Sequence, residues 1–211
     1  MMMNRERIGF WVRLLSIVLA AFFIGSFIFV GLGTNLNYNL FDLIGGSNQQ
    51  QGGQTTGPQE QIKQAEKQLR ENPKDPEKIK TLAALYYQSG RYGDAARVLE
   101  NGREAAPKDA EMAILLGQVY SQQAQTAAGE KQRKVLYAKS ADAYAAAAKI
   151  EPKNQDTYLL AGQAYDQAGE PAQAIKYYNG YLDLEPKGKQ ADAVKERISS
   201  LLRGGETTGG V

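Results

Sequence analysis

Residues 155–186 read QDTYLLAGQAYDQAGEPAQAIKYYNGYLDLEP. Small and apolar side chains recur in this stretch every three or four residues, which is the spacing of one buried stripe on an α-helix. Pro171 divides the stretch, and proline suits a first helical position because its missing N–H needs no partner there. Pro186 closes the second half. The stretch therefore predicts two amphipathic helices that pack together as a hairpin.

The same arrangement recurs along the chain. Prolines at 73, 107, 152 and 186 are 34, 45 and 34 residues apart, and a 34-residue period is typical of stacked helical hairpins. Ten positions agree in residue type between the first and third units: Ile79, Leu82, Ala83, Tyr86, Gly90, Tyr92, Ala95, Leu99, Gly102 and Pro107 in the first, and Tyr158, Ala161, Gly162, Tyr165, Gly169, Pro171, Ala174, Tyr178, Tyr181 and Pro186 in the third.

These positions resemble the pattern of the tetratricopeptide repeat (TPR) family. The resemblance implies an all-α solenoid of three helical hairpins with flanking capping helices, inside a domain of residues 58–203. The repeats are expected near residues 76–109, 110–154 and 155–188. Residues 58–71 resemble the second half of a repeat and would cap the front, and residues 189–203 would cap the back. Residues 204–211 are expected to be a disordered tail.

The middle unit carries 11 extra residues between its two helices. Eleven residues preserve the phase of an α-helix, so we expect the insertion to lengthen both helices, with Gly129 at the turn. This protrusion, residues 121–134, is called the knob below. Lys131, Arg133 and Lys134 give it a small basic tip. The knob is either a docking point or only a lengthening of the hairpin.

Local signals mark where the first helix of each unit begins. Asp75, Asp109 and Asn154 each stand one residue before such a helix, where a short side-chain oxygen can accept a hydrogen bond from a free backbone N–H. The Ala and Gly positions are expected to let the two helices of a hairpin approach closely. The tyrosines that recur near the end of the first helix are expected to fill the space between hairpins: Tyr86, Tyr120 and Tyr165.

The N-terminal part of the chain has a different composition. Residues 14–32 read LLSIVLAAFFIGSFIFVGL, an uncharged run of 19 residues, and a hydrocarbon core of ~30 Å needs about this length. We therefore expect one transmembrane helix over residues 13–33. Arg5, Arg7 and Arg13 precede it, so the basic flank should stay in the cytoplasm.

This topology makes residues 1–12 a cytoplasmic N-terminus and residues 34–57 a flexible Gly/Gln-rich linker. The TPR domain would then be extracytoplasmic, held at a cytoplasmic (inner) membrane by a single-pass anchor. The alternative is a cleaved signal peptide, which normally has a shorter apolar core and a small-x-small cleavage site. The following GLGTNLNYN offers no convincing site, and the absence of cysteine excludes a lipoprotein anchor.

Composition removes several function classes. The chain has 12 Tyr but no His and no Cys, which excludes thiol chemistry, histidine-based catalysis and the common zinc sites. No pair of carboxylates is placed for catalysis by an evident motif, so we expect no enzyme, no metal and no cofactor. The formal net charge is only +2, without the basic stripe that nucleic-acid binding would need.

The TPR resemblance also implies where partners bind, because such repeats line a concave groove with their first helices. Twelve residues, called the groove set below, are carried over to this surface: Lys80, Ala84, Tyr87, Gln88, Ile114, Gln118, Ser121, Gln122, Leu159, Gln163, Asp166 and Gln167. Its glutamines could hydrogen-bond the backbone of an extended segment, or they are simply helix-forming surface residues. Lys80 matches one place of the family's carboxylate clamp, but Ala84, Leu115, Asp156 and Leu160 do not, which argues against that activity.

Together these features predict a membrane-anchored interaction module. It would bind client or partner proteins outside the cytoplasmic membrane and assist the assembly or escort of exported or membrane proteins. Two alternatives remain open, a self-associating structural scaffold of an envelope complex and a subunit of c-type cytochrome maturation. The sequence does not decide the oligomeric state or the client.

Overall fold

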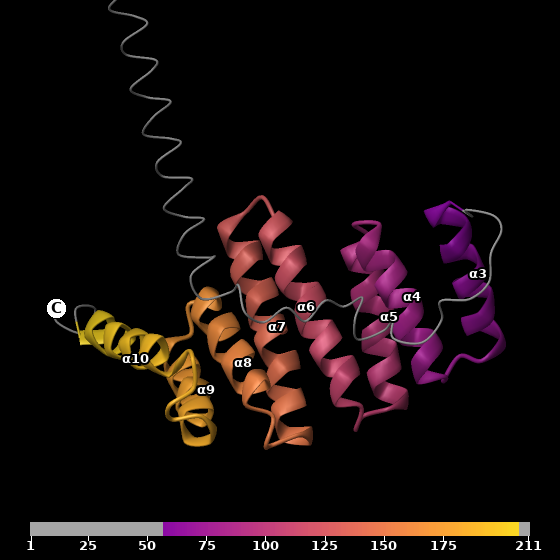
Figure 1. Ribbon diagram of the computed structural model, residues 1–211. Helices are drawn as coiled ribbons and strands as arrows, with labels where there is room; N and C mark the ends of the chain where they lie inside the picture. The colour runs from indigo at the N-terminus through magenta and orange to yellow at the C-terminus, as the bar shows by residue number, and fades with distance from the viewer. Residues whose placement is uncertain (1–56, 207–211) are drawn as a thin grey trace, which may run out of the picture. The chain divides into compact units, whose positions relative to one another are not determined.

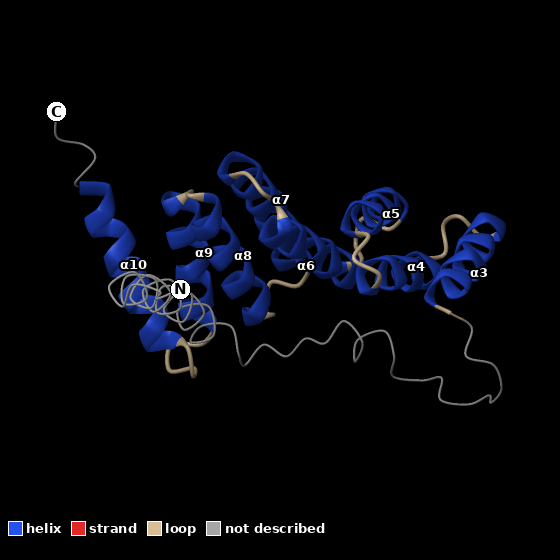
Figure 2. Cartoon of the chain, turned by 90° about the horizontal axis from the view of Figure 1, so that it is seen from above, coloured by secondary structure: helices blue, strands red, loops and turns tan. Residues whose placement is uncertain are grey.

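The computed structural model describes residues 57–206. The predicted transmembrane helix and most of the predicted linker lie outside the described residues. Within residues 57–206 the chain forms helices joined by short turns, without a strand (Figures 1 and 2). They are α3 (Pro58–Glu71), α4 (Pro76–Gln88), α5 (Tyr92–Ala105), α6 (Ala110–Thr126), α7 (Glu130–Ile150), α8 (Gln155–Ala168), α9 (Pro171–Leu184) and α10 (Ala191–Glu206).

Each described helix packs against the next one along the chain, as Figure 1 shows. The three hairpins are α4–α5, α6–α7 and α8–α9, and α3 and α10 flank them. The first helices of the first two hairpins also meet, since α4 contacts α6. The buried residues of each helix recur with helical spacing, as in Ile79, Leu82, Ala83 and Tyr86 of α4. The all-α solenoid predicted from the repeat pattern is therefore confirmed.

Two of the three predicted helix caps form. The Asp75 side chain accepts hydrogen bonds from two backbone N–H groups of α4 at 3.0 and 3.3 Å, and Asp109 accepts one from α6 at 2.8 Å. The prediction for Asn154 is wrong, because its side chain makes no capping bond. Its Nδ2 instead donates a hydrogen bond to the Glu151 carboxylate at 3.1 Å. This carboxylate, which lies just before α8, orients the Asn154 side-chain amide.

The glycines of the first helices face tyrosine rings of the second helices. A Cβ atom built on Gly117 would lie 2.7 Å from the ring of Tyr144, and one built on Gly162 would lie 2.6 Å from the ring of Tyr178. Both distances are shorter than real Cβ contacts. The close approach of the helices at these glycines is thus confirmed, and it explains why a larger residue does not fit.

The insertion lengthens both helices of the middle hairpin, as predicted. Helices α6 and α7 have 17 and 21 residues, compared with 13 and 14 in α4 and α5. Gly129 stands directly before α7, in the turn between the two long helices. The basic tip of the knob is exposed, and Lys134 pairs with Glu130 at 2.8 Å.

Helix α10 ends at Glu206, three residues beyond the predicted end of the cap at residue 203. Glycine destabilises a helix only modestly. Gly204 and Gly205 therefore still allow α10 to continue beyond residue 203. None of the helices in residues 57–206 combines the length and the apolar composition that a membrane span requires.

Candidate functional site

The groove set lies on the first helices of the three hairpins, α4, α6 and α8. Three of its members are buried: Lys80 is 5% exposed, Ala84 6% and Leu159 1%. These three side chains pack against neighbouring helices and offer a partner almost no surface. Each of the other nine retains some exposed surface.

Lys80 is committed to contacts within the chain. Its Nζ donates to Glu111 of α6 and pairs with Glu77 at 2.8 Å, and Asp109 lies 4.0 Å away. Burial by itself would lower the pKa of Lys80, but the hydrogen bonds to Glu111 and Glu77 outweigh it and raise that pKa above its ordinary value. Lys80 therefore joins α4 to α6 as a charged amine and is not available to clamp a partner's carboxylate.

Asp166, the other charged member of the groove set, is also paired. Arg197 of α10 donates to its two carboxylate oxygens from Nε at 2.5 Å and Nη2 at 2.6 Å, and the Tyr178 hydroxyl donates at 3.3 Å. The hydrogen bond to Asp166 raises the pKa of Arg197, so the guanidinium stays charged. This bidentate pair fixes α10 to α8. The two charged members of the set are thus neutralised by partners from the chain itself.

Ser121 forms a hydroxyl chain with the second helix of its hairpin. Its Oγ lies 2.7 Å from Oγ of Ser140, which is fully buried and donates to the Gly117 carbonyl at 2.7 Å. These hydroxyl hydrogen bonds tie α7 to α6. Ser121 thus acts partly as a packing residue.

The glutamines are the polar side chains of the groove set that keep free capacity for hydrogen bonds. Gln118, Gln122 and Gln163 are half-buried, and Gln88 and Gln167 are exposed. The Nε2 atom of Gln163 is shielded from solvent and has no hydrogen-bond partner among the described residues. A shielded amide without a partner is uncommon in native proteins and calls for an explanation.

Two apolar members of the groove set also keep exposed surface. Ile114 and Tyr87 are half-buried, and the ring of Tyr87 meets that of Tyr92 edge to face at 5.4 Å between centroids. The arrangement combines neutral hydrogen-bonding groups with apolar contacts and holds no free charge in the set. Among residues 57–206, no group of three or more acidic side chains lies close enough to hold a metal ion.

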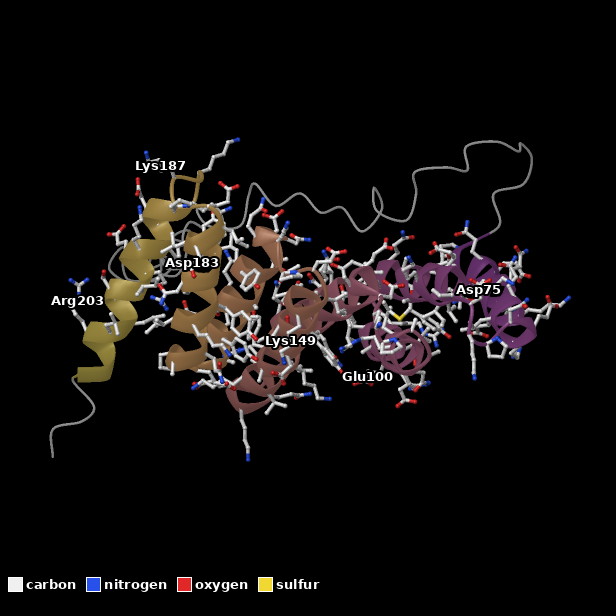
Figure 3. The ribbon with its side chains drawn as sticks, turned by 90° about the horizontal axis from the view of Figure 1, so that it is seen from below. Asp75, Glu100, Lys149, Asp183, Lys187 and Arg203 are labelled. Atoms are coloured by element: carbon white, nitrogen blue, oxygen red, sulfur yellow. The ribbon has the colours of Figure 1, made fainter. Side chains whose placement is uncertain are left out.

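Sequence reasoning missed a repeated contact between hairpins. The tyrosine near the end of each first helix donates a hydrogen bond to a carboxylate of the preceding helix: Tyr86 to Glu66 at 2.7 Å, Tyr120 to Glu100, and Tyr165 to Asp142 at 2.8 Å. Figure 3 labels Glu100 on α5. Burial, followed by the bond to Glu66, raises the pKa of Tyr86 to about 12. An acidic residue 20 or 23 positions before each tyrosine was the available signal.

Two hollows lie elsewhere on the described surface. One of about 540 Å³ is lined by residues of α3, α4 and α5, and one of about 500 Å³ by residues of α5, α6 and α7. The second is rimmed by the charged side chains of Glu100, Arg103, Glu104, Lys139 and Asp142. No member of the groove set lines either hollow, so they are separate from the groove surface.

The stacked hairpins define a solenoid of the kind that binds other proteins. Two models of the tetratricopeptide repeat match the chain, one over residues 59–119 and the other over residues 131–189. Together these matches span more than half of the chain, which therefore belongs to the tetratricopeptide repeat family. Its fold is that of a protein interaction module, typically a non-catalytic scaffold, and neither matching model is that of an enzyme.

Solved structures of TPR proteins are similar in fold. A double mutant of MamA RS-1 is 17% identical, with a TM-score of 0.50 over 72% of this chain and 87% of that chain. TTC0263, a TPR protein from Thermus thermophilus, is 21% identical, with a TM-score of 0.48 over 66% and 70% of the two chains. The type III secretion chaperone SycD of Yersinia enterocolitica, in complex with a YopD peptide, is 22% identical, with a TM-score of 0.44 over 64% and 94%. No curated protein sequence matches this chain.

Proposed function

We propose that this chain is a membrane-anchored TPR protein that holds partner proteins at the extracytoplasmic face of a cytoplasmic membrane. It would assist the assembly or escort of exported or membrane proteins. The anchoring part is supported by the uncharged run at residues 14–32 and by Arg5, Arg7 and Arg13 before it.

One observation carries the binding part of the proposal. The groove set keeps five glutamines with free amide capacity, and one of them, Gln163, has a shielded nitrogen without a partner. Both charged members of the set are already paired within the chain. The surface is therefore suited to a neutral partner segment rather than to a terminal carboxylate.

Photocrosslinking in native membranes tests the binding part. A photoreactive side chain replaces Gln118 in the groove, Lys131 at the tip of the knob or, as a control, the exposed Gln64 on α3. We expect defined partner proteins to be captured from position 118 and not from position 64. Capture from position 131 alone would move the function to the knob. Capture of only a second copy of this chain would replace the proposal by a self-associating scaffold.

Protease accessibility tests the topology separately. Protease added outside intact spheroplasts should digest the TPR domain, because the basic flank of the anchor stays inside. Protection of the domain, with an exposed control protein digested in the same sample, would place it on the cytoplasmic side and contradict the proposal.

A further inference from the structure

We propose that the hollow between α5, α6 and α7 is a docking site for an aromatic side chain of a partner protein, with a basic residue beside that ring. This hollow has a volume of about 500 Å³ and is lined by no member of the groove set. The inference therefore goes beyond the function proposed for the groove. It is carried by the way in which the third hairpin fills the equivalent space with its own tyrosine, and by the charges around the hollow.

The middle and third hairpins carry different residues at one equivalent position. Tyr144 of α7 and Tyr178 of α9 occupy the same place, because each ring packs on a glycine in the first helix of its hairpin. The residue before each of these tyrosines is therefore equivalent as well. It is Ala143 in α7 and Tyr177 in α9. The middle hairpin thus has a methyl group where the third hairpin has a phenol ring.

The ring of Tyr177 covers the tyrosine near the end of the first helix of its hairpin. It stacks on Tyr165 of α8 with the centroids 5.3 Å apart and the planes inclined by 23°, and it is only 8% exposed. Burial, followed by the nearby charge of Asp142, raises the pKa of Tyr177. Because Asp142 belongs to α7, the ring extends from α9 toward the preceding second helix.

In the middle hairpin the corresponding space is the hollow. Tyr120 of α6 is the counterpart of Tyr165, and each donates its hydroxyl to a carboxylate of the preceding second helix. Tyr120, Leu116 and Ala143 are buried residues that line the hollow and make its apolar floor. A ring supplied by a partner can therefore stack on Tyr120 as Tyr177 stacks on Tyr165.

Lys139 covers the ring of Tyr120 in the free chain. Its Nζ lies 5.1 Å from the centroid of that ring, and the Lys139 side chain is exposed and forms no ion pair with the described residues. An exposed cation–π contact is weak. The flexible Lys139 side chain can therefore move off Tyr120 when a partner's ring enters.

The charges around the hollow favour a basic residue beside that ring. The hollow is lined by three carboxylates and two basic groups: Glu100, Glu104, Asp142, Arg103 and Lys139. No ion pair joins any two of them within residues 57–206, so one carboxylate is in excess. The chain's own aromatic group has a basic neighbour too, since Lys176 directly precedes Tyr177 and its Nζ lies 5.4 Å from the ring centroid. A lysine or arginine next to the partner's ring would complement the charge of the hollow.

Photocrosslinking from the hollow identifies the partner. A side chain with an aliphatic diazirine, which has no ring of its own, replaces Lys139 in the full chain in native membranes. Mass spectrometry then locates the crosslinked residue on the captured protein. We expect a defined partner protein, crosslinked close to an aromatic residue that has a lysine or arginine beside it. Absence of capture, capture of only a second copy of this chain, or a crosslinked segment without an aromatic residue would overturn the inference.

Filling the hollow from within tests the aromatic contact. Ala143→Tyr supplies in α7 the ring that Tyr177 supplies in α9, and it should reduce capture from position 139 by about tenfold or more, as loss of a central aromatic anchor does. The matched control is Val98→Tyr, which adds a tyrosine at the same repeat position in α5, at the hollow lined by α3, α4 and α5. This control should leave capture unchanged. Undiminished capture with Ala143→Tyr, or equal losses in both variants, would contradict the inference.

Two further measurements separate this result from misfolding and from the groove. The urea midpoint of Ala143→Tyr should not be lower than that of the unaltered chain, because the new ring enters an existing hollow; a lower midpoint would show that the ring does not fit. Replacing the mapped aromatic residue of the partner by alanine tests the same contact without changing this chain, and undiminished capture would overturn the inference. Capture from position 118 should persist in Ala143→Tyr. Its absence in the unaltered chain would contradict the proposed function of the groove alone.

Discussion

Replacing Gly162 by alanine should destabilise the third hairpin. The new Cβ atom would lie 2.6 Å from Cδ1 and 2.8 Å from Cε1 of Tyr178. This ring is only 4% exposed, and its hydroxyl is bound to Asp166, so it has little room to move. Overpacking of this kind costs about 1–3 kcal/mol, whereas alanine is favoured over glycine inside a helix by roughly 0.5–1 kcal/mol. The free energy of unfolding should therefore fall by about 1 kcal/mol, and by no more than about 2.5 kcal/mol.

Thermal and urea unfolding of residues 57–206, followed by circular dichroism, measure this loss. For a domain of this size, 1 kcal/mol lowers Tm by roughly 2–4 °C. The control is Gly93→Ala in α5, where the nearest atom to the new Cβ is Nε2 of Gln123 at 3.9 Å. Its stability should be unchanged or slightly raised. The reasoning is refuted if Gly162→Ala is as stable as the control, or if adding Tyr178→Leu does not remove its penalty.

Three further predictions concern single side chains. Lys80→Ala leaves Glu111 without its partner and should lower the urea midpoint by an amount equivalent to roughly 1–3 kcal/mol. Tyr86 has a pKa of about 12 in the folded chain, compared with an ordinary value of 10.0, so its contribution is complete below pH 10.0 and is lost as pH rises toward 12. Urea midpoints from pH 9 upward should therefore fall less steeply in Tyr86→Phe than in the unaltered chain. Asp75→Ala removes two capping bonds and should cost about 1 kcal/mol, whereas Asn154→Ala should cost clearly less; equal losses in paired melts would contradict the observed caps.

The repeat pattern was sufficient for those parts of the fold that depend on local sequence. Helical spacing predicted the stacked hairpins, and the phase argument predicted that the insertion would extend α6 and α7 around Gly129. Asp75 and Asp109 were predictable as caps because a cap depends on residues within one turn. The predicted cap at Asn154 was wrong for a local reason as well, because the Asn154 side chain hydrogen-bonds the neighbouring Glu151 carboxylate instead.

Contacts between helices were not predictable in the same way. Glu111 and Arg197 each lie 31 residues from their partners, Lys80 and Asp166, and nothing in a single helix selects such pairs. These ion pairs depend on the angle and the axial offset at which one helix packs on another. The same packing determines how much surface each groove residue keeps, which is why the burial of Ala84 and Leu159 could not be read from the repeat register.

Packing between chain neighbours makes the stiffness of this solenoid uneven along its length. Stability in such an array is close to a sum of nearest-neighbour interfaces. Helices α6 and α7 are the longest and share the most extensive interface, whereas α3 and α10 have described helices on one side only. Opening should therefore travel inward from both ends, with amide exchange fastest in α3 and α10 and slowest in the middle hairpin. A partner lying along α4, α6 and α8 would then contact a rigid middle hairpin and more flexible ends of the solenoid. The ends could adjust to partner segments of different size while the middle hairpin keeps its structure.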